Sequence, residues 1–218
     1  MNSPVVAVLA YGSGNVHSAV KALQAAGAEV RLTADPKFIA TADGLFVPGV
    51  GAFDAVMQQL TAVNGVAAIN ERLADGKPVM GICVGQQILF ESGTERQVHS
   101  AGLGILSGSV AALPAKTLPH MGWNTVAVDP RSTLFAGLAD EAFYFVHSNA
   151  VSSYENGGVR ALSPALAGEE VLLTTAEHEG AKFIAAVECG PLSATQFHPE
   201  KSGSAGLKLL SNWINSLR

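Results

Sequence analysis

Short apolar runs alternate with amphipathic stretches over the first ninety residues. Runs rich in valine, isoleucine and leucine predict buried strands at residues 5–10, 29–33, 44–47 and 78–82. Apolar positions at helical spacing predict intervening helices after residue 15, from residue 35, and over residues 54–60 and 66–74. Strands that alternate with helices predict an α/β fold, with a mostly parallel sheet flanked by helices.

The pattern changes after about residue 98. Short strand-like segments separated by glycine-rich turns are expected to be antiparallel hairpins added to the sheet edge, at residues 102–104, 108–113, 123–128 and 143–146. Further strands are expected at residues 170–175, 183–188 and 192–197. A closing helix over residues 205–217 is predicted to turn four apolar residues inward, Leu207, Leu210, Ile214 and Leu217. No linker or repeat interrupts the chain, so we expect residues 1–218 to form a single domain.

Composition narrows the class of protein. The 218 residues are 48% hydrophobic, enough for a large core, and a net charge of −5 without long charged runs argues against a nucleic-acid surface. The first apolar run is too short for a signal peptide or a membrane span. Cys83 and Cys189 form neither a disulfide framework nor a zinc pattern. We expect a cytoplasmic protein that needs no metal and no cofactor.

One turn joins the fourth predicted strand to the segment after it. Gly81-Ile82-Cys83-Val84-Gly85 has the G-x-C-x-G layout of a nucleophile elbow, in which flanking glycines relieve backbone crowding. We expect residues 84–90 to start a helix, whose N-terminus favours a thiolate. The N–H of Val84 would face a developing oxyanion. Taken alone, Cys83 is equally compatible with a buried cysteine packed between two elements.

A cysteine nucleophile needs a base and a group that orients the base. His198 follows a predicted strand and precedes a proline, which favours an extended backbone. Glu200, two residues on, can reach the same imidazole and fix its tautomer. The alternative is a histidine that merely caps a turn at the end of a strand.

The third predicted strand runs into Pro48-Gly49-Val50-Gly51. A loop of this composition at a strand end can turn a backbone N–H of Val50 or Gly51 toward an anion. Together with the Val84 N–H it could complete an oxyanion hole. The alternative is an ordinary turn between a strand and a helix, which uses similar residues.

These three motifs, in this order, resemble the class I (triad) glutamine amidotransferases over essentially the whole chain. The resemblance implies glutamine hydrolysis through a γ-glutamyl thioester, with ammonia passed to a synthase. It implies that Cys83 is the nucleophile, His198 the base and Glu200 its orienter. It also implies contacts with the glutamine substrate by three further residues, Gln87, Glu95 and Ser148.

Other segments resemble one subfamily, the glutaminase subunits of imidazole glycerol phosphate synthase in histidine biosynthesis. They are Tyr11-Gly12-Ser13-Gly14-Asn15-Val16-His17-Ser18, His120-Met121-Gly122-Trp123-Asn124, Tyr144-Phe145-Val146-His147-Ser148 and His198-Pro199-Glu200-Lys201-Ser202-Gly203. In that subfamily the partner is a (β/α)8-barrel cyclase. The resemblance implies four residues that face this cyclase, Asn15, Trp123, Tyr144 and Lys201. Without it, these residues would be read as a helix cap, two core aromatics and a solvated lysine.

The sequence departs from the family pattern at three positions. Asn149 stands where tyrosine is usual, Gln86 where methionine is usual, and Val84 where leucine is usual. Val84 contributes a backbone group, so its side chain matters little, whereas Asn149 puts fine substrate contacts in doubt. Three alternatives remain open: a glutaminase for another synthase (anthranilate, GMP or CTP type), a γ-glutamyl peptidase without a partner, and an inactive scaffold subunit.

Overall fold

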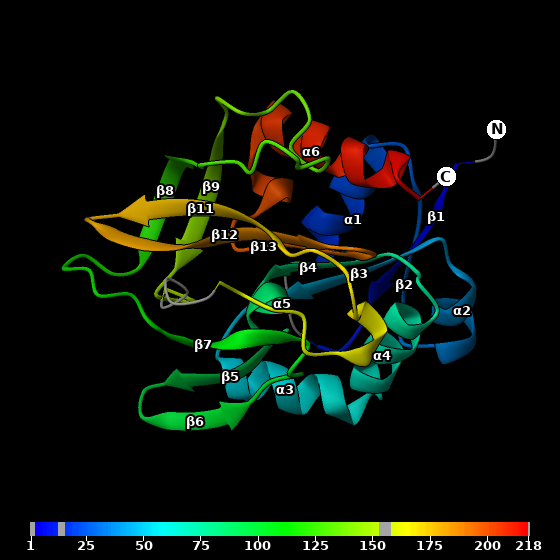
Figure 1. Ribbon diagram of the computed structural model, residues 1–218. Helices are drawn as coiled ribbons and strands as arrows, with labels where there is room; N and C mark the ends of the chain where they lie inside the picture. Colours follow the sequence, from blue (N-terminus) through cyan, green and yellow to red (C-terminus); the bar gives the residue numbers. More distant parts are fainter. Residues whose placement is uncertain (1–2, 13–15, 153–157, 218) are drawn as a thin grey trace.

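The largest element of the fold is a seven-stranded sheet. The computed structural model describes residues 3–12, 16–152 and 158–217. Strand order in the main sheet is β11-β12-β13-β4-β3-β1-β2 (Figure 1). Five strands are mutually parallel, β1 (Val5–Leu9), β2 (Glu29–Thr33), β3 (Gly44–Gly49), β4 (Val79–Cys83) and β13 (Leu192–Thr195). The antiparallel strands β12 (Ala181–Cys189) and β11 (Leu172–His178) complete one edge. The predicted α/β class and mostly parallel sheet are therefore confirmed.

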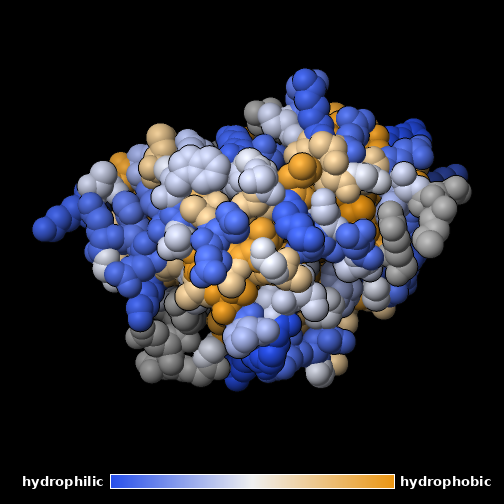
Figure 2. Space-filling view, turned by 90° about the horizontal axis from the view of Figure 1, so that it is seen from above, coloured by the Kyte–Doolittle hydropathy of each residue, from blue (hydrophilic) through white to orange (hydrophobic). Residues whose placement is uncertain are grey.

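Helices cover both faces of this sheet (Figure 1). One face carries α1 (Val16–Ala25) and α6 (Gly203–Asn215), which pack together. The other face carries α2 (Pro36–Thr41), α3 (Phe53–Ala62) and α4 (Gly65–Ala74). Figure 2 looks onto the α1 and α6 side, where apolar and polar residues are mixed across the surface. No helix among the described residues has both the length and the apolar composition to cross a membrane.

The strands of the middle region form two further sheets. The first contains β5 (Phe90–Glu95), β6 (Val98–Ala101), β7 (Leu106–Ala112) and β10 (Asn149–Ala150). The second pairs β8 (His120–Thr125) with β9 (Ala142–His147). The prediction that these segments join the edge of the main sheet is wrong for the strands of these two sheets, although the segment after β8 meets edge strand β11 in an isolated antiparallel bridge between Ala127 and Thr175. Alternating polarity identifies a strand and its buried face, but its partner is fixed by contacts distant in sequence.

The closing helix α6 differs from its prediction in the face it buries. Leu210 and Ile214 are buried as expected, but Leu207 is 38% exposed. The buried side includes Gly206, where an added Cβ would collide with the carbonyl oxygen of Pro199. The Pro199–Lys201 turn (η2) therefore lies so close to α6 that small residues must face it. Leu217 packs against the core while remaining partly exposed.

A buried arginine joins the helices of one face to the sheet. The Arg72 guanidinium in α4 is 2% exposed and donates to four carbonyl oxygens, those of Ile39, Ala42, Asp43 and Pro78. Two of these carbonyls lie at or just after the C-terminal end of α2, and the last one precedes β4. Arg72 thereby fixes the entry to the strand that ends at Cys83.

Candidate active site

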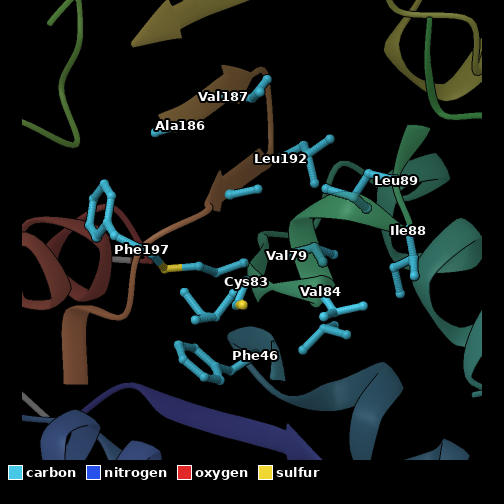
Figure 3. Packing of buried hydrophobic residues seen from close by; sticks show 14 of the residues in the cluster. Phe46, Val79, Cys83, Val84, Ile88, Leu89, Ala186, Val187, Leu192 and Phe197 are labelled. Carbon is cyan, nitrogen blue, oxygen red and sulfur yellow. The ribbon is translucent and has the colours of Figure 1, made fainter. Parts of the chain in front are cut away.

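Cys83 is the last residue of β4 and has a left-handed backbone, with φ 57° and ψ −112°. A non-glycine residue in this region is strained, as expected at a nucleophile elbow. Figure 3 shows Cys83 among buried side chains that include Phe46, Val84 and Phe197. The sharp turn predicted at this position is confirmed.

The helix after Cys83 is much shorter than predicted. It contains one turn, α5 (Val84–Gln87), and strand β5 already begins at Phe90. An apolar run such as residues 84–90 cannot be assigned to helix or strand by its periodicity alone. A single turn has only a small dipole, so stabilisation of a thiolate must come mainly from side chains near the sulfur.

Glycines make the elbow possible by allowing close backbone contact. A Cβ added at Gly81 would lie 2.5 Å from the carbonyl oxygen of Gly85, and one added at Gly85 would collide with the carbonyl oxygen of Val47. A Cβ at Gly49 would in turn collide with the backbone nitrogen of Gly85. Strand β3, strand β4 and the turn after Cys83 are therefore packed backbone against backbone.

Three predicted catalytic residues are connected. His198 Nδ1 lies 2.7 Å from Glu200 Oε1, with both side chains at least nine-tenths buried. The imidazole also interacts with Cys83, and because Nδ1 faces the carboxylate, Nε2 is the nitrogen left for the sulfur. Burial alone would lower the pKa of His198, but the interactions with Cys83 and Glu200 outweigh it and raise that pKa to about 9. This arrangement favours a protonated imidazole beside the Cys83 sulfur.

A cavity of about 280 Å³ opens over the sulfur. It is lined by Val50, Gly51, Cys83, Val84, Gln87, Glu95, Val146, His147, Ser148, Asn149, His198 and Lys201. The structure thus brings together every residue expected at the nucleophile, the oxyanion hole and the substrate contacts. Glu200 does not line this cavity and reaches it only through His198.

The residues expected to contact glutamine come from different elements. Gln87 in α5 donates through Nε2 to Asn149 O at 2.8 Å, which joins the elbow to the segment after β9. Glu95 ends β5, and its Oε2 accepts a hydrogen bond from Phe53 N at 3.1 Å. Because Phe53 begins α3, this carboxylate both faces the cavity and holds the helix that follows the Val50–Gly51 loop.

The residues expected at a partner interface lie beside the cavity. Trp123 on β8 is 59% exposed, and its ring meets Tyr144 on β9 edge to face at 6.1 Å. Tyr144 O accepts a hydrogen bond from His198 N at 2.9 Å, so the hairpin contacts the catalytic segment directly. Lys201 is exposed and also lines the cavity. Asn15 lies outside the described residues.

Sequence reasoning missed a polar network behind the cavity. Gln196 is fully buried, donates through Nε2 to Cys83 Sγ at 3.6 Å and accepts from Gln87 Nε2 at 2.9 Å. His147 Nδ1 lies 3.1 Å from Asn149 O, and its Nε2 lies 3.1 Å from His120 Nδ1. The signal in the sequence was a glutamine directly before Phe197-His198, at the end of a predicted strand.

Burial lowers the pKa of both histidines in this network, to about 3 for His147 and about 4 for His120. Both rings are therefore neutral near pH 7. In the described part of the chain, no group of three or more histidine, cysteine or acidic side chains is arranged to hold a metal ion.

Comparison with known proteins places the chain in a family. The model of the family "Glutamine amidotransferase class-I" matches residues 7–216. Proteins named imidazole glycerol phosphate synthase subunit HisH are similar throughout, at 57% identity in Leifsonia xyli subsp. xyli and 56% in Nocardia farcinica, each over 100% of both chains. The corresponding protein of Corynebacterium diphtheriae is 56% identical over 97% of this chain and 99% of its own length.

Solved structures agree in fold. A crystal structure described as a glutamine amidotransferase covers 97% of this chain and 97% of its own, with a TM-score of 0.69 and 21% identity. The structure of PurLQS from Thermotoga maritima covers 99% of this chain and 100% of the matched chain, with a TM-score of 0.67 and 21% identity. Since relatives above 50% identity match from end to end, the chain belongs to the class I glutamine amidotransferase family, in the group of imidazole glycerol phosphate synthase HisH subunits.

Proposed function

We propose that this chain hydrolyses L-glutamine to glutamate and ammonia through a thioester on Cys83. The observation that carries the proposal is the connected set Cys83, His198 and Glu200, with the sulfur at the wall of a cavity. A strained elbow, a base and an orienting carboxylate are the parts that cysteine-based acyl transfer requires.

The reaction follows from the positions of these groups. The Cys83 thiolate attacks the side-chain amide carbon of glutamine, and His198 gives a proton to the departing ammonia. Backbone N–H groups of Val84 and of the Val50–Gly51 loop stabilise the oxyanion. A water molecule then attacks the thioester and gives a proton to His198, which releases glutamate and restores the thiol–imidazole pair.

The substrate contacts are proposed from the cavity wall. Both N–H groups of the Gln87 side chain are held, by Asn149 O and Gln196 Oε1, so its oxygen is the atom left for a ligand donor. Glu95 supplies a carboxylate that suits the α-ammonium group of an amino acid. Ser148 offers a hydroxyl and backbone groups near the opposite wall, which suit the α-carboxylate.

The proposed recipient of ammonia is the (β/α)8-barrel cyclase subunit of imidazole glycerol phosphate synthase, which forms imidazole glycerol phosphate and AICAR. We propose Trp123, Tyr144, Lys201 and Asn15 as the residues that face this cyclase. An exposed tryptophan beside a cavity that holds the nucleophile supports the choice, since aromatic residues anchor protein interfaces. The hydrogen bond from His198 N to Tyr144 O offers a direct connection from that surface to the base.

Release of ammonia without a recipient would waste glutamine. We therefore propose that the Val50–Gly51 loop is misoriented for oxyanion binding until the cyclase carries its own ligand, which shifts the population of loop conformations. Gly51 has φ +101°, a conformation from which its peptide can reorient at little steric cost.

The deciding experiment is a glutaminase assay on the chain alone and with the cyclase and its nucleotide ligand, for wild type, Cys83→Ala and Trp123→Ala. We expect low activity alone, a large increase in the complex and none with Cys83→Ala. We expect Trp123→Ala to weaken association by about 2 kcal/mol or more, as at interface hot spots. Equal activity with and without cyclase would reject the partner and favour an independent amidase. A folded chain without activity in any mixture would indicate a scaffold.

A further inference from the structure

Gln196 is a buried amide beside the nucleophile that the reaction above does not use. It follows β13 directly, is 0% exposed, and its backbone N–H donates to Ala185 O at 2.8 Å. Residues 196 and 197 form a bend after the strand, and the side chains of Gln196 and His198 both reach Cys83. Phe197 points the other way and stacks on Phe143, with ring centroids 4.3 Å apart.

The orientation of the Gln196 amide follows from its hydrogen-bond partners. Asn149 O can only accept, so the atom of Gln87 that lies 2.8 Å from it must be the NH₂ group. That same nitrogen lies 2.9 Å from the Gln196 amide, so the Gln196 atom facing it must be oxygen. The Gln196 NH₂ group is then the one that lies 3.6 Å from Cys83 Sγ. A chain of partners that ends on a backbone carbonyl thus leaves the sulfur with an N–H donor.

We propose that Gln196 is a positioning residue, which donates a hydrogen bond to the Cys83 sulfur, favours the thiolate and holds Gln87 at the cavity wall. Since α5 is a single turn, a side-chain donor supplies stabilisation that a longer helix would have given. His198 and Gln196, two residues apart in one short segment after β13, then both contact the same sulfur. The proposal deepens the glutaminase role assigned to Cys83, but it concerns the thiol and can be tested without glutamine.

The test measures the rate of Cys83 alkylation by iodoacetamide as a function of pH, on the full chain, with modification followed by peptide mass. In Gln196→Met the side chain keeps its size and loses its N–H donor. We expect the midpoint of the profile to rise by about 0.5 to 1 pH unit, which makes the reaction about three- to tenfold slower at pH values below the midpoint. Gln196→Glu keeps the acceptor for Gln87 and places a carboxylate against the sulfur, so its midpoint is expected to rise at least as far.

Gln86→Met is the matched control. Gln86 is 1% exposed and donates to Ile184 O at 3.3 Å, so the control removes a neighbouring buried amide that does not contact Cys83. Its profile is expected to match wild type. Unchanged midpoints in both Gln196 variants, or an equal rise in the control, would overturn the proposal. If Gln196→Met does not fold, Gln196→Glu decides alone. Failure of the glutaminase assay would leave this readout intact, which separates the two proposals.

Discussion

Replacing Glu200 by glutamine should weaken the base without removing it. Glu200 Oε1 lies 2.7 Å from His198 Nδ1, and the side chains are 6% and 3% exposed. Glutamine keeps a neutral oxygen at that position, so the imidazole can stay in place. What is lost is the negative charge that favours the imidazolium. The pKa of His198 is therefore expected to fall from its raised value of about 9.

The size of the effect follows from the strength of the contact. A buried hydrogen bond to a charged group contributes about 1.5 to 3 kcal/mol, which corresponds to a fall of about one to two pH units in the pKa of His198. The imidazolium that donates a proton to ammonia is stabilised by the same contact. We therefore expect kcat to fall about 10- to 100-fold, with KM for glutamine little changed, because Glu200 does not line the cavity.

The assay is steady-state glutamate production in the complex with cyclase, combined with NMR titration of the His198 ring in the isolated chain. Glu71→Gln, which neutralises an exposed carboxylate on α4, is the control and should behave as wild type. Wild-type turnover together with an unshifted His198 titration in Glu200→Gln would refute the reasoning. A rise in KM with kcat unchanged would indicate a role of Glu200 in substrate binding and would also contradict the reasoning.

Three further predictions concern the scaffold. Gly85→Ala should reduce the free energy of unfolding by more than about 3 kcal/mol in denaturant titration, because the added Cβ collides with Val47 O. The control Gly76→Ala places its Cβ against no neighbour, so its loss of stability should be smaller and come from backbone strain alone. Arg72→Met should cost about 2 to 5 kcal/mol in the same measurement, because it leaves the buried carbonyl oxygens of Ile39 and Ala42 without this donor. In a series of melts against pH, stability should peak near pH 6.5. Stability should fall by up to roughly 3 kcal/mol as the pH rises through about 9, because folded His198 then loses its proton. It should also fall in acid, because only the unfolded chain then protonates His147. A flat profile would contradict both assignments.

The first half of the fold was predictable because its periodicity is local. Strand β2 has the predicted bounds, and β1, β3 and β4 differ by one or two residues at their ends. Each of these strands is a short apolar run bounded by turn residues, and each pairs in parallel with a neighbour through an intervening helix. In that arrangement the local hydrophobic pattern and the pairing of strands agree, so the pattern of each segment also predicts its place in a parallel sheet.

The middle of the chain was not predictable in the same way. Strand β5 begins within the apolar run that follows Cys83, where helix and strand give the same sequence pattern. Strand β8 pairs with β9 across a long connection, and nothing within either segment specifies that choice. On α6 the prediction was wrong for Leu207, which is exposed, because the close contact with the Pro199–Lys201 turn is made by Gly206 against Pro199 O and not by a large apolar residue.

In the candidate site, too, residues in short sequence motifs could be predicted, whereas a residue defined by contacts distant in sequence could not. Cys83 and the His198–Glu200 pair lie in short motifs whose spacing carries chemistry, so they could be named from sequence. Gln196 could not, because its partners Cys83 and Gln87 are more than a hundred residues away and the role depends on which amide atom faces which partner. A buried glutamine at the end of a strand indicates that some polar partner exists, but the three-dimensional structure is needed to identify that partner.

The hairpin β8–β9 connects the exposed surface around Trp123 to His198. Trp123 is exposed on β8, its ring contacts Tyr144 on β9, and Tyr144 O holds the backbone N–H of His198. Ser202 Oγ, one residue past the Pro199–Lys201 turn, donates to His198 O and accepts from Tyr144 N. His198 is thus joined by hydrogen bonds to a strand whose neighbour carries an exposed aromatic residue. A protein that docked on Trp123 would contact the hairpin whose Tyr144 O accepts the His198 backbone N–H, so this hairpin offers a route from the surface to His198 that does not involve the Val50–Gly51 loop.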